Sequence, residues 1–175
     1  MNRTALALLA VVFAGVPAAF AWWAFGRPAE WLMTERGLLL TEGQATGQFQ
    51  VVAVFSIVGV VVGLVSGFLV HRLARPARWQ ALVGLAGAST AAALVCWRLG
   101  IRLGPPPPQD VTGAEVLELV PSQFAVDTIV PFLVWPLAAV LAYTLSLYLS
   151  TDGVDEEWDE ADEGAADDLS VRSER

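Results

Sequence analysis

Four long apolar segments constrain the fold of this chain more than any other feature. They cover residues 5–25, 51–70, 81–101 and 126–149 of 175, and the second contains no charged residue. A helix needs ~20 apolar residues to cross the ~30 Å hydrocarbon core of a bilayer. The sequence therefore predicts an all-α membrane protein in which residues 1–150 form a bundle of four transmembrane helices.

The first segment has two interpretations. Arg3, the apolar stretch and the "AFA" at 19–21 have the pattern of a signal peptide that would be cleaved after about residue 21. However, the apolar run continues through Trp22 and Trp23 to Phe25, and tryptophans are typical of the membrane–water interface. We favour a retained helix, and cleavage remains the alternative.

The last 25 residues differ from the rest in composition. Residues 151–175 hold eleven acidic residues and two arginines, a net charge of −9, with few apolar side chains. Such a segment cannot bury enough apolar surface to fold alone, so we expect a disordered acidic tail. A solvated spacer is the simpler role. The alternative is docking of a basic cytoplasmic partner around Trp158.

The arginines indicate an orientation. Arg3 precedes the first segment, and Arg72, Arg75 and Arg78 lie in the short loop between the second and third. Loops rich in arginine remain in the cytoplasm, where this cluster would contact anionic lipid headgroups. The opposite side also carries four arginines, so the dense short loop decides. We expect both termini to be cytoplasmic, with His71 as an interfacial anchor.

Small residues recur along one face of each of the last three segments. In a bilayer, helices associate where small side chains let two backbones approach closely. The predicted packing residues are Ser56, Gly59, Gly63, Ser66, Gly67, Gly84, Gly87, Ala88, Ala91, Ala138 and Ala142. They predict helix–helix contacts within this chain or with another membrane protein, and the alternative is a chance pattern in a chain rich in Gly and Ala.

Three charged residues lie at the outer ends of these faces. Arg98 and Arg102 follow the third face, and Asp127 precedes the fourth. An ionisable residue near the membrane usually has a partner. We expect one arginine to pair with Asp127 and fix the register of two helices. A polar substrate site is the less favoured reading.

The two helical hairpins share short sequences. "WAFG" at 23–26 matches "WRLG" at 97–100, and "QFQV" at 48–51 matches "QFAV" at 123–126, at distances of 74 and 75 residues. These matches predict a tandem duplication, unless they arise by chance. Gln48 and Gln123 would then be equivalent and flank the outer mouth near Arg98, Arg102 and Asp127. The loops 26–47 and 103–122 either pack on each other as a cap or lie along the membrane interface.

The sequence contains no motif for catalysis, and we predict that the protein is not an enzyme. There is no G-x-S-x-G, H-E-x-x-H, P-loop, G-x-G-x-x-G or C-x-x-C. One His and one Cys leave few metal or nucleophile–base arrangements, so no cofactor and no metal site are expected. An enzyme that acts through carboxylates in the outer loops is a weaker alternative. The acidic tail and the spans argue against a nucleic acid partner.

The order of spans and motifs along this chain resembles that in a known group of proteins. A short N-terminal span and a Gly-rich second span are followed by W-x-x-G-x-R-L-G-P from Trp97 and by "FLVWPLAAVLAY" from Phe132. Over about residues 1–150 the chain is similar to small four-helix actinobacterial membrane proteins of unknown function. The resemblance implies a plasma-membrane location and no substrate. The expected role is that of an accessory or scaffold protein, and the alternative is a small transporter or channel subunit.

Overall fold

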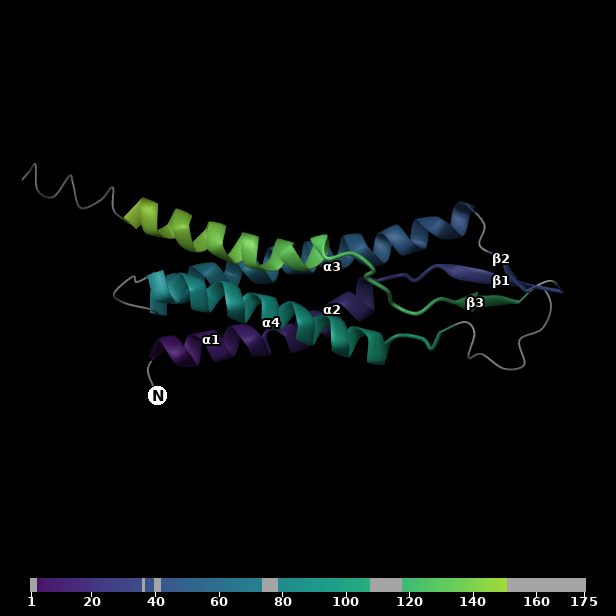
Figure 1. Cartoon of the computed structure of the whole chain (residues 1–175), viewed down its shortest axis with the longest axis horizontal. Coiled ribbons are helices and arrows are strands. Elements are labelled where there is room, and N and C mark those ends of the chain that lie inside the picture. Colours follow the sequence, from purple (N-terminus) through teal and green to yellow (C-terminus); the bar gives the residue numbers. More distant parts are fainter. Residues whose placement is uncertain (1–2, 36, 40–41, 74–78, 108–117, 151–175) are drawn as a thin grey trace, which may run out of the picture.

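The computed structural model describes residues 3–35, 37–39, 42–73, 79–107 and 118–150. The helices are α1 (Arg3–Phe13), α2 (Gly15–Phe25), α3 (Glu42–Leu73), α4 (Trp79–Leu103) and Val130–Ser150, here called the C-terminal helix. The strands are β1 (Glu30–Thr34), β2 (Gly37–Leu39) and β3 (Leu119–Pro121). The helices form an elongated bundle with the strands beyond one end (Figure 1).

All four predicted segments are helices long and apolar enough to cross a membrane: Arg3–Phe25, Thr46–Leu73, Trp79–Leu103 and Val130–Ser150. Two boundaries differ from the prediction by four residues or more. α3 begins nine residues before residue 51, and the C-terminal helix begins four residues after residue 126. Pro131 therefore lies in the first turn of its helix, where its missing N–H removes no intrahelical bond. The predicted tail, residues 151–175, lies outside the described residues.

The first span is two helices rather than one. α1 ends at Phe13, Ala14 forms a turn, and α2 begins at Gly15. Pro17 explains the interruption, because a proline inside a helix has no N–H and its ring clashes with the carbonyl four residues earlier. That carbonyl belongs to Phe13, the last residue of α1. The equivalent position in α4 is Ala91, and α4 continues without a break.

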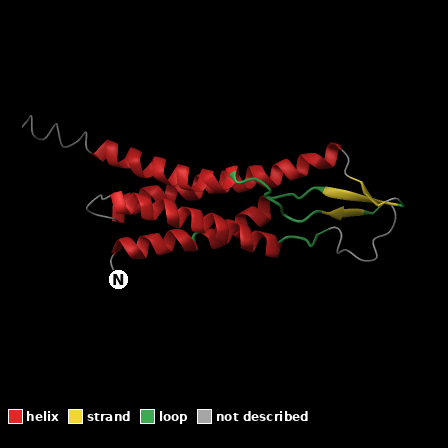
Figure 2. Ribbon diagram, viewed as in Figure 1, coloured by secondary structure: helices red, strands yellow, loops and turns green. Residues whose placement is uncertain are grey.

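An antiparallel sheet of three strands corrects the all-α prediction. The strand order is β2-β1-β3, with Leu32 opposite Leu39 on one side and Trp31 opposite Val120 on the other. Because β1 and β3 come from the two loops at the same end of the bundle, these loops pack on each other as a cap (Figure 2). Backbone bonds from Met33 N–H to Glu118 O (3.0 Å) and from Ser122 N–H to Ala29 O (2.6 Å) extend this pairing.

The helices pack as two pairs. α1 and α2 pack chiefly on α4, and α3 packs on the C-terminal helix. One core cluster surrounds Trp22, Phe55 and Trp135, which are fully buried. A second cluster lies nearer the other end, around Leu85, Ala139 and Tyr143. Both clusters contain residues from all four spans, so the bundle is one packing unit.

Burial repeats along the chain. In the first span and α4, buried residues recur 74 positions apart: Ala7 and Ala81, Val11 and Leu85, Ala18 and Ala92, Ala19 and Ala93, Trp22 and Cys96. In α3 and the C-terminal helix the distance is 76: Gly59 and Trp135, Gly63 and Ala139, Gly67 and Tyr143. Tandem duplication predicts equivalent buried faces of this kind. The second helices are shifted by one residue from the predicted distance of 75.

Candidate functional site

The glycine face of α3 packs against the C-terminal helix of the same chain. A Cβ on Gly63 would lie 2.8 Å from the Cβ of Ala138, and a Cβ on Gly67 would lie 2.9 Å from the Cβ of Ala142. Gly59 faces the indole of Trp135. These spaces are too small for any side chain beyond glycine. Another membrane protein could use this face only after displacing the C-terminal helix.

The serines of this face have different environments. Ser66 is buried between the helices, whereas Ser56 is half-buried and its Oγ donates a 2.9 Å hydrogen bond to the carbonyl of Val52. A hydroxyl bonded to its own helix is satisfied without a partner across the interface. Ser56 therefore adds little to the contact with the C-terminal helix.

The predicted face of α4 is only partly used. Ala88 is buried, Gly84 contacts Leu8 and Ala91 is half-buried, but nothing lies within 4 Å of a Cβ on Gly87. The buried face runs instead through Ala81, Leu85, Ala88, Ser89, Ala92, Ala93, Cys96 and Gly100. Two contacts on this face have no predicted counterpart: Gly15 faces the carbonyl of Ala92, and Gly100 faces the ring of Trp22.

The outer charged residues do not form the predicted pair. Arg98, Arg102 and Asp127 are all exposed, and within the described ranges no ion pair joins either arginine to Asp127. The guanidinium of Arg98 lies over the ring of its neighbour Trp97, 5.0 Å from the ring centroid. A cation at this distance from an indole is stabilised by the ring quadrupole. Arg98 therefore has a local partner at the outer end of the bundle.

Gln48 and Gln123, the equivalent positions of the repeated Q-F-x-V sequences, lie together at the end of the bundle that carries the strands. They line one small hollow with Ala29, Val51 and Ser122, and its volume is about 10 Å³. A single water needs ~10–15 Å³. The hollow therefore has room for about one water and none for a solute.

At the opposite end of the bundle lie those arginines used to predict the orientation that fall within the described residues. Arg3 and Arg72 are exposed there, and Arg72 lies over Phe68 at 4.9 Å from the ring centroid. His71 has partners on the C-terminal helix: its Nε2 lies 3.2 Å from Ser150 Oγ, and its ring packs edge-on against Tyr143. Arg75 and Arg78 lie outside the described residues.

A long apolar groove separates the first span from α3. Its volume is about 690 Å³, and apart from Ser66 its lining side chains are apolar. The first span contributes mainly small residues, whereas α3 contributes valine, isoleucine and leucine. Ile57, Val61 and Val65 line the groove and are more than half exposed, so the groove opens at the surface of the bundle.

The described residues contain few side chains that could ligate a metal ion. No group of three or more His, Cys, Asp or Glu side chains within them could hold a metal ion. Cys96 is buried in the core and Tyr143 is buried beside His71. Comparison with known proteins gives no further guidance, since no family model, no curated protein and no solved structure matches this chain.

Proposed function

We propose that this chain is a non-enzymatic accessory or scaffold protein of the plasma membrane, with both termini in the cytoplasm. The observation that carries the proposal is the apolar interior of the bundle. Trp22, Phe55, Leu85 and Trp135 fill its centre and are fully buried. A protein of this construction holds a fixed shape in the bilayer and offers its ends and its lipid-facing surface for contacts.

The same interior argues against a transporter or channel subunit. A solute path needs polar groups that replace the hydration of the solute as it crosses. In the described part of the bundle, Ser66 and Ser89 are buried, and Trp135 and Tyr143 bury one polar side-chain atom each. The outer hollow at Gln48 and Gln123 has space for about one water. Transport therefore remains the second candidate, without a specific observation in its favour.

The cap supports a role in extracytoplasmic contact. Its sheet has two edge strands, β2 and β3, each three residues long. Edge strands carry backbone groups that can pair with another chain. In the proposed orientation the cap faces away from the cytoplasm and the acidic tail serves as a cytoplasmic spacer.

The proposal is tested by the size of the native assembly. We expect the tagged full-length chain, solubilised in mild detergent after cross-linking in its own membrane, to migrate as a discrete complex larger than a monomer. A chain ending at residue 150 separates contacts of the tail from contacts of the bundle and cap. A monomer in both cases would contradict the scaffold role.

Orientation is tested separately with single cysteines. In a Cys96→Ser background, Ser150→Cys and Glu30→Cys place one thiol at each end of the described bundle. We expect a membrane-impermeant maleimide to label residue 30 in intact cells and residue 150 only after lysis. The reverse pattern would overturn the proposed topology.

A further inference from the structure

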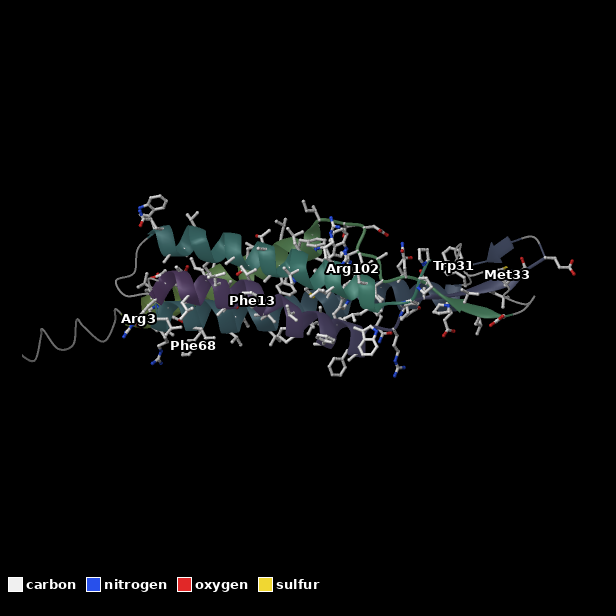
Figure 3. All side chains as sticks on the ribbon, turned by 90° about the horizontal axis from the view of Figure 1, so that it is seen from below. Arg3, Phe13, Trp31, Met33, Phe68 and Arg102 are labelled. Atoms are coloured by element: carbon white, nitrogen blue, oxygen red, sulfur yellow. The ribbon has the colours of Figure 1, made fainter. Side chains whose placement is uncertain are left out.

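The apolar groove between the first span and α3 ends beside two arginines. Its inner end is lined by Ala7 from α1 and by Leu69 and Leu73 from α3. Arg3 lies one helical turn before Ala7, and Arg72 lies between the two leucines in sequence. Figure 3 shows Arg3 at the same end of the bundle as Phe68, over which Arg72 is stacked. Two exposed cations therefore lie where the groove reaches the end of the bundle.

Helix periodicity places both arginines on the walls of the groove. At 3.6 residues per turn, Arg3 lies on the face of Ala7, Ala10 and Ala14, because these residues follow it by four, seven and eleven positions. Arg72 follows Val65 by seven positions and Val61 by eleven, so it continues the α3 wall. Each wall is thus an apolar stripe whose face continues to an arginine beyond the lining residues.

The size and the lining of the groove suit a narrow hydrocarbon chain. Its volume of about 690 Å³ lies within the range of small-molecule sites, ~300–1,000 Å³. A transmembrane helix of ~20 residues, ~30 Å long and ~10 Å wide, occupies about 2,400 Å³. A helix docked in this open groove would insert only the side chains of one face, so the two arginines at the end of the groove, rather than its volume, favour an occupant with an anionic group. A narrow hydrocarbon chain matches both its volume and its apolar lining.

We propose that this groove binds an anionic phospholipid. One acyl chain lies between the alanine stripe of the first span and the valine stripe of α3, and the phosphate lies between Arg3 and Arg72. The charge of the two guanidinium groups selects an anionic headgroup, and the apolar walls hold the chain. This inference requires that the chain spans a bilayer, and it is independent of the proposed scaffold role.

The headgroup part is tested by native mass spectrometry of the purified full-length chain. The protein is offered equal amounts of phosphatidylglycerol and phosphatidylcholine with identical acyl chains. We expect one retained phosphatidylglycerol and a preference of about fivefold or more, the effect of one arginine near an anionic headgroup. The double variant Arg3→Gln, Arg72→Gln should lose the preference. Arg3→Lys, Arg72→Lys and the outer-end control Arg27→Gln should keep it.

The groove part is tested with a matched pair of substitutions on α1. Ala10 lines the groove and is exposed, whereas Ala5 is exposed on the opposite face of the same helix. Ala10→Phe should abolish retention of either lipid, and Ala5→Phe should leave it unchanged. Val61→Phe fills the groove from α3 and serves as the second variant if Ala10→Phe does not fold. Free glycerol phosphate should not compete, because it lacks the acyl chain.

Three results would overturn the inference. The first is equal retention of the two lipids by the unmodified chain. The second is unchanged lipid retention in folded Ala10→Phe or Val61→Phe. The third is a dimer of the unmodified chain that these substitutions dissociate, because the groove would then hold a helix from a second copy.

Discussion

The indole Nε1 of Trp22 donates a 2.9 Å hydrogen bond to the backbone carbonyl of Val51, joining α2 to α3 inside the bundle. The Trp22 ring also packs edge-on against Phe55 and Phe124, with centroids 5.0 and 5.2 Å away. Trp22 thus joins the first span, the second span and the segment before the C-terminal helix. Its neighbour Trp23 is 48% exposed and provides a natural control.

We expect Trp22→Phe to lower the free energy of unfolding by about 1–3 kcal/mol. The substitution removes the hydrogen-bond donor and leaves space where the larger ring packed. Trp23→Phe should change stability by less than about 0.5 kcal/mol, since it alters an exposed ring. Unfolding of both variants in detergent would measure the difference, and equal effects would contradict a special role for Trp22.

Gly63 and Gly87 should respond to substitution in opposite ways. A Cβ on Gly63 would lie 2.7 Å from the carbonyl oxygen of Trp135, whereas nothing lies within 4 Å of one on Gly87. We expect Gly63→Ala to destabilise the bundle by about 1–3 kcal/mol through overpacking. Gly87→Ala should stabilise α4 by up to about 1 kcal/mol, because alanine is the better helix former. Thermal unfolding in detergent would check the signs, and loss of stability in Gly87→Ala would indicate a contact that the structure lacks.

Arg98 and Asp127 should act independently. Arg98 is stacked on Trp97 and, among the described contacts, is not paired with Asp127. In a double-mutant cycle with Arg98→Gln and Asp127→Asn, we expect the two effects on unfolding to add within about 0.5 kcal/mol. A coupling energy of about 1 kcal/mol or more would contradict this independence and support the ion pair that the sequence predicts.

The cap can be tested through two adjacent residues of β3. Val120 is buried, whereas Leu119 is 49% exposed. We expect Val120→Asp to open the sheet, because a carboxylate buried without a partner is costly. Amide hydrogen exchange should then accelerate at Met33 and Ser122, whose N–H groups bond across the cap. Leu119→Asp should leave both amides protected, and a similar acceleration in the two variants would show that β3 does not hold the cap.

The sequence predicts the helices better than their contacts. Length and hydropathy locate all four spans. In α3 the three glycines identify the buried face, because the residues on the other faces of this helix are large. In α4 the size of side chains could not decide between faces. Gly84, Gly87 and Ala91 form one small-residue face, and Ala81, Ser89 and Ala92 form a neighbouring one. The buried face depends on where α1 and α2 pack, and local sequence does not contain that information.

The strand pairing of the sheet and the position of the groove also depend on how distant segments pack, so the local sequence does not predict them. β1 and β3 are short and about 90 residues apart, and pairing at that distance leaves no local period. The groove exists because α3 packs on the C-terminal helix rather than closely along the first span. Gln48 and Gln123 are a partial exception: the repeated Q-F-x-V sequence predicts that they are equivalent and flank one end of the bundle, and the structure shows that they line one hollow.

The pairing of helices across the two hairpins also has a consequence for biosynthesis. Gly59, Gly63 and Gly67 meet the C-terminal helix, whose residues are made about 75 positions later. When the first hairpin has been synthesised, its glycine face is therefore still uncovered, and α4 is not yet present to cover α2. Neither hairpin is complete by itself, so the first cannot finish its packing until the second has been made. A chain stopped after residue 78 should be degraded rapidly, whatever the full-length protein does.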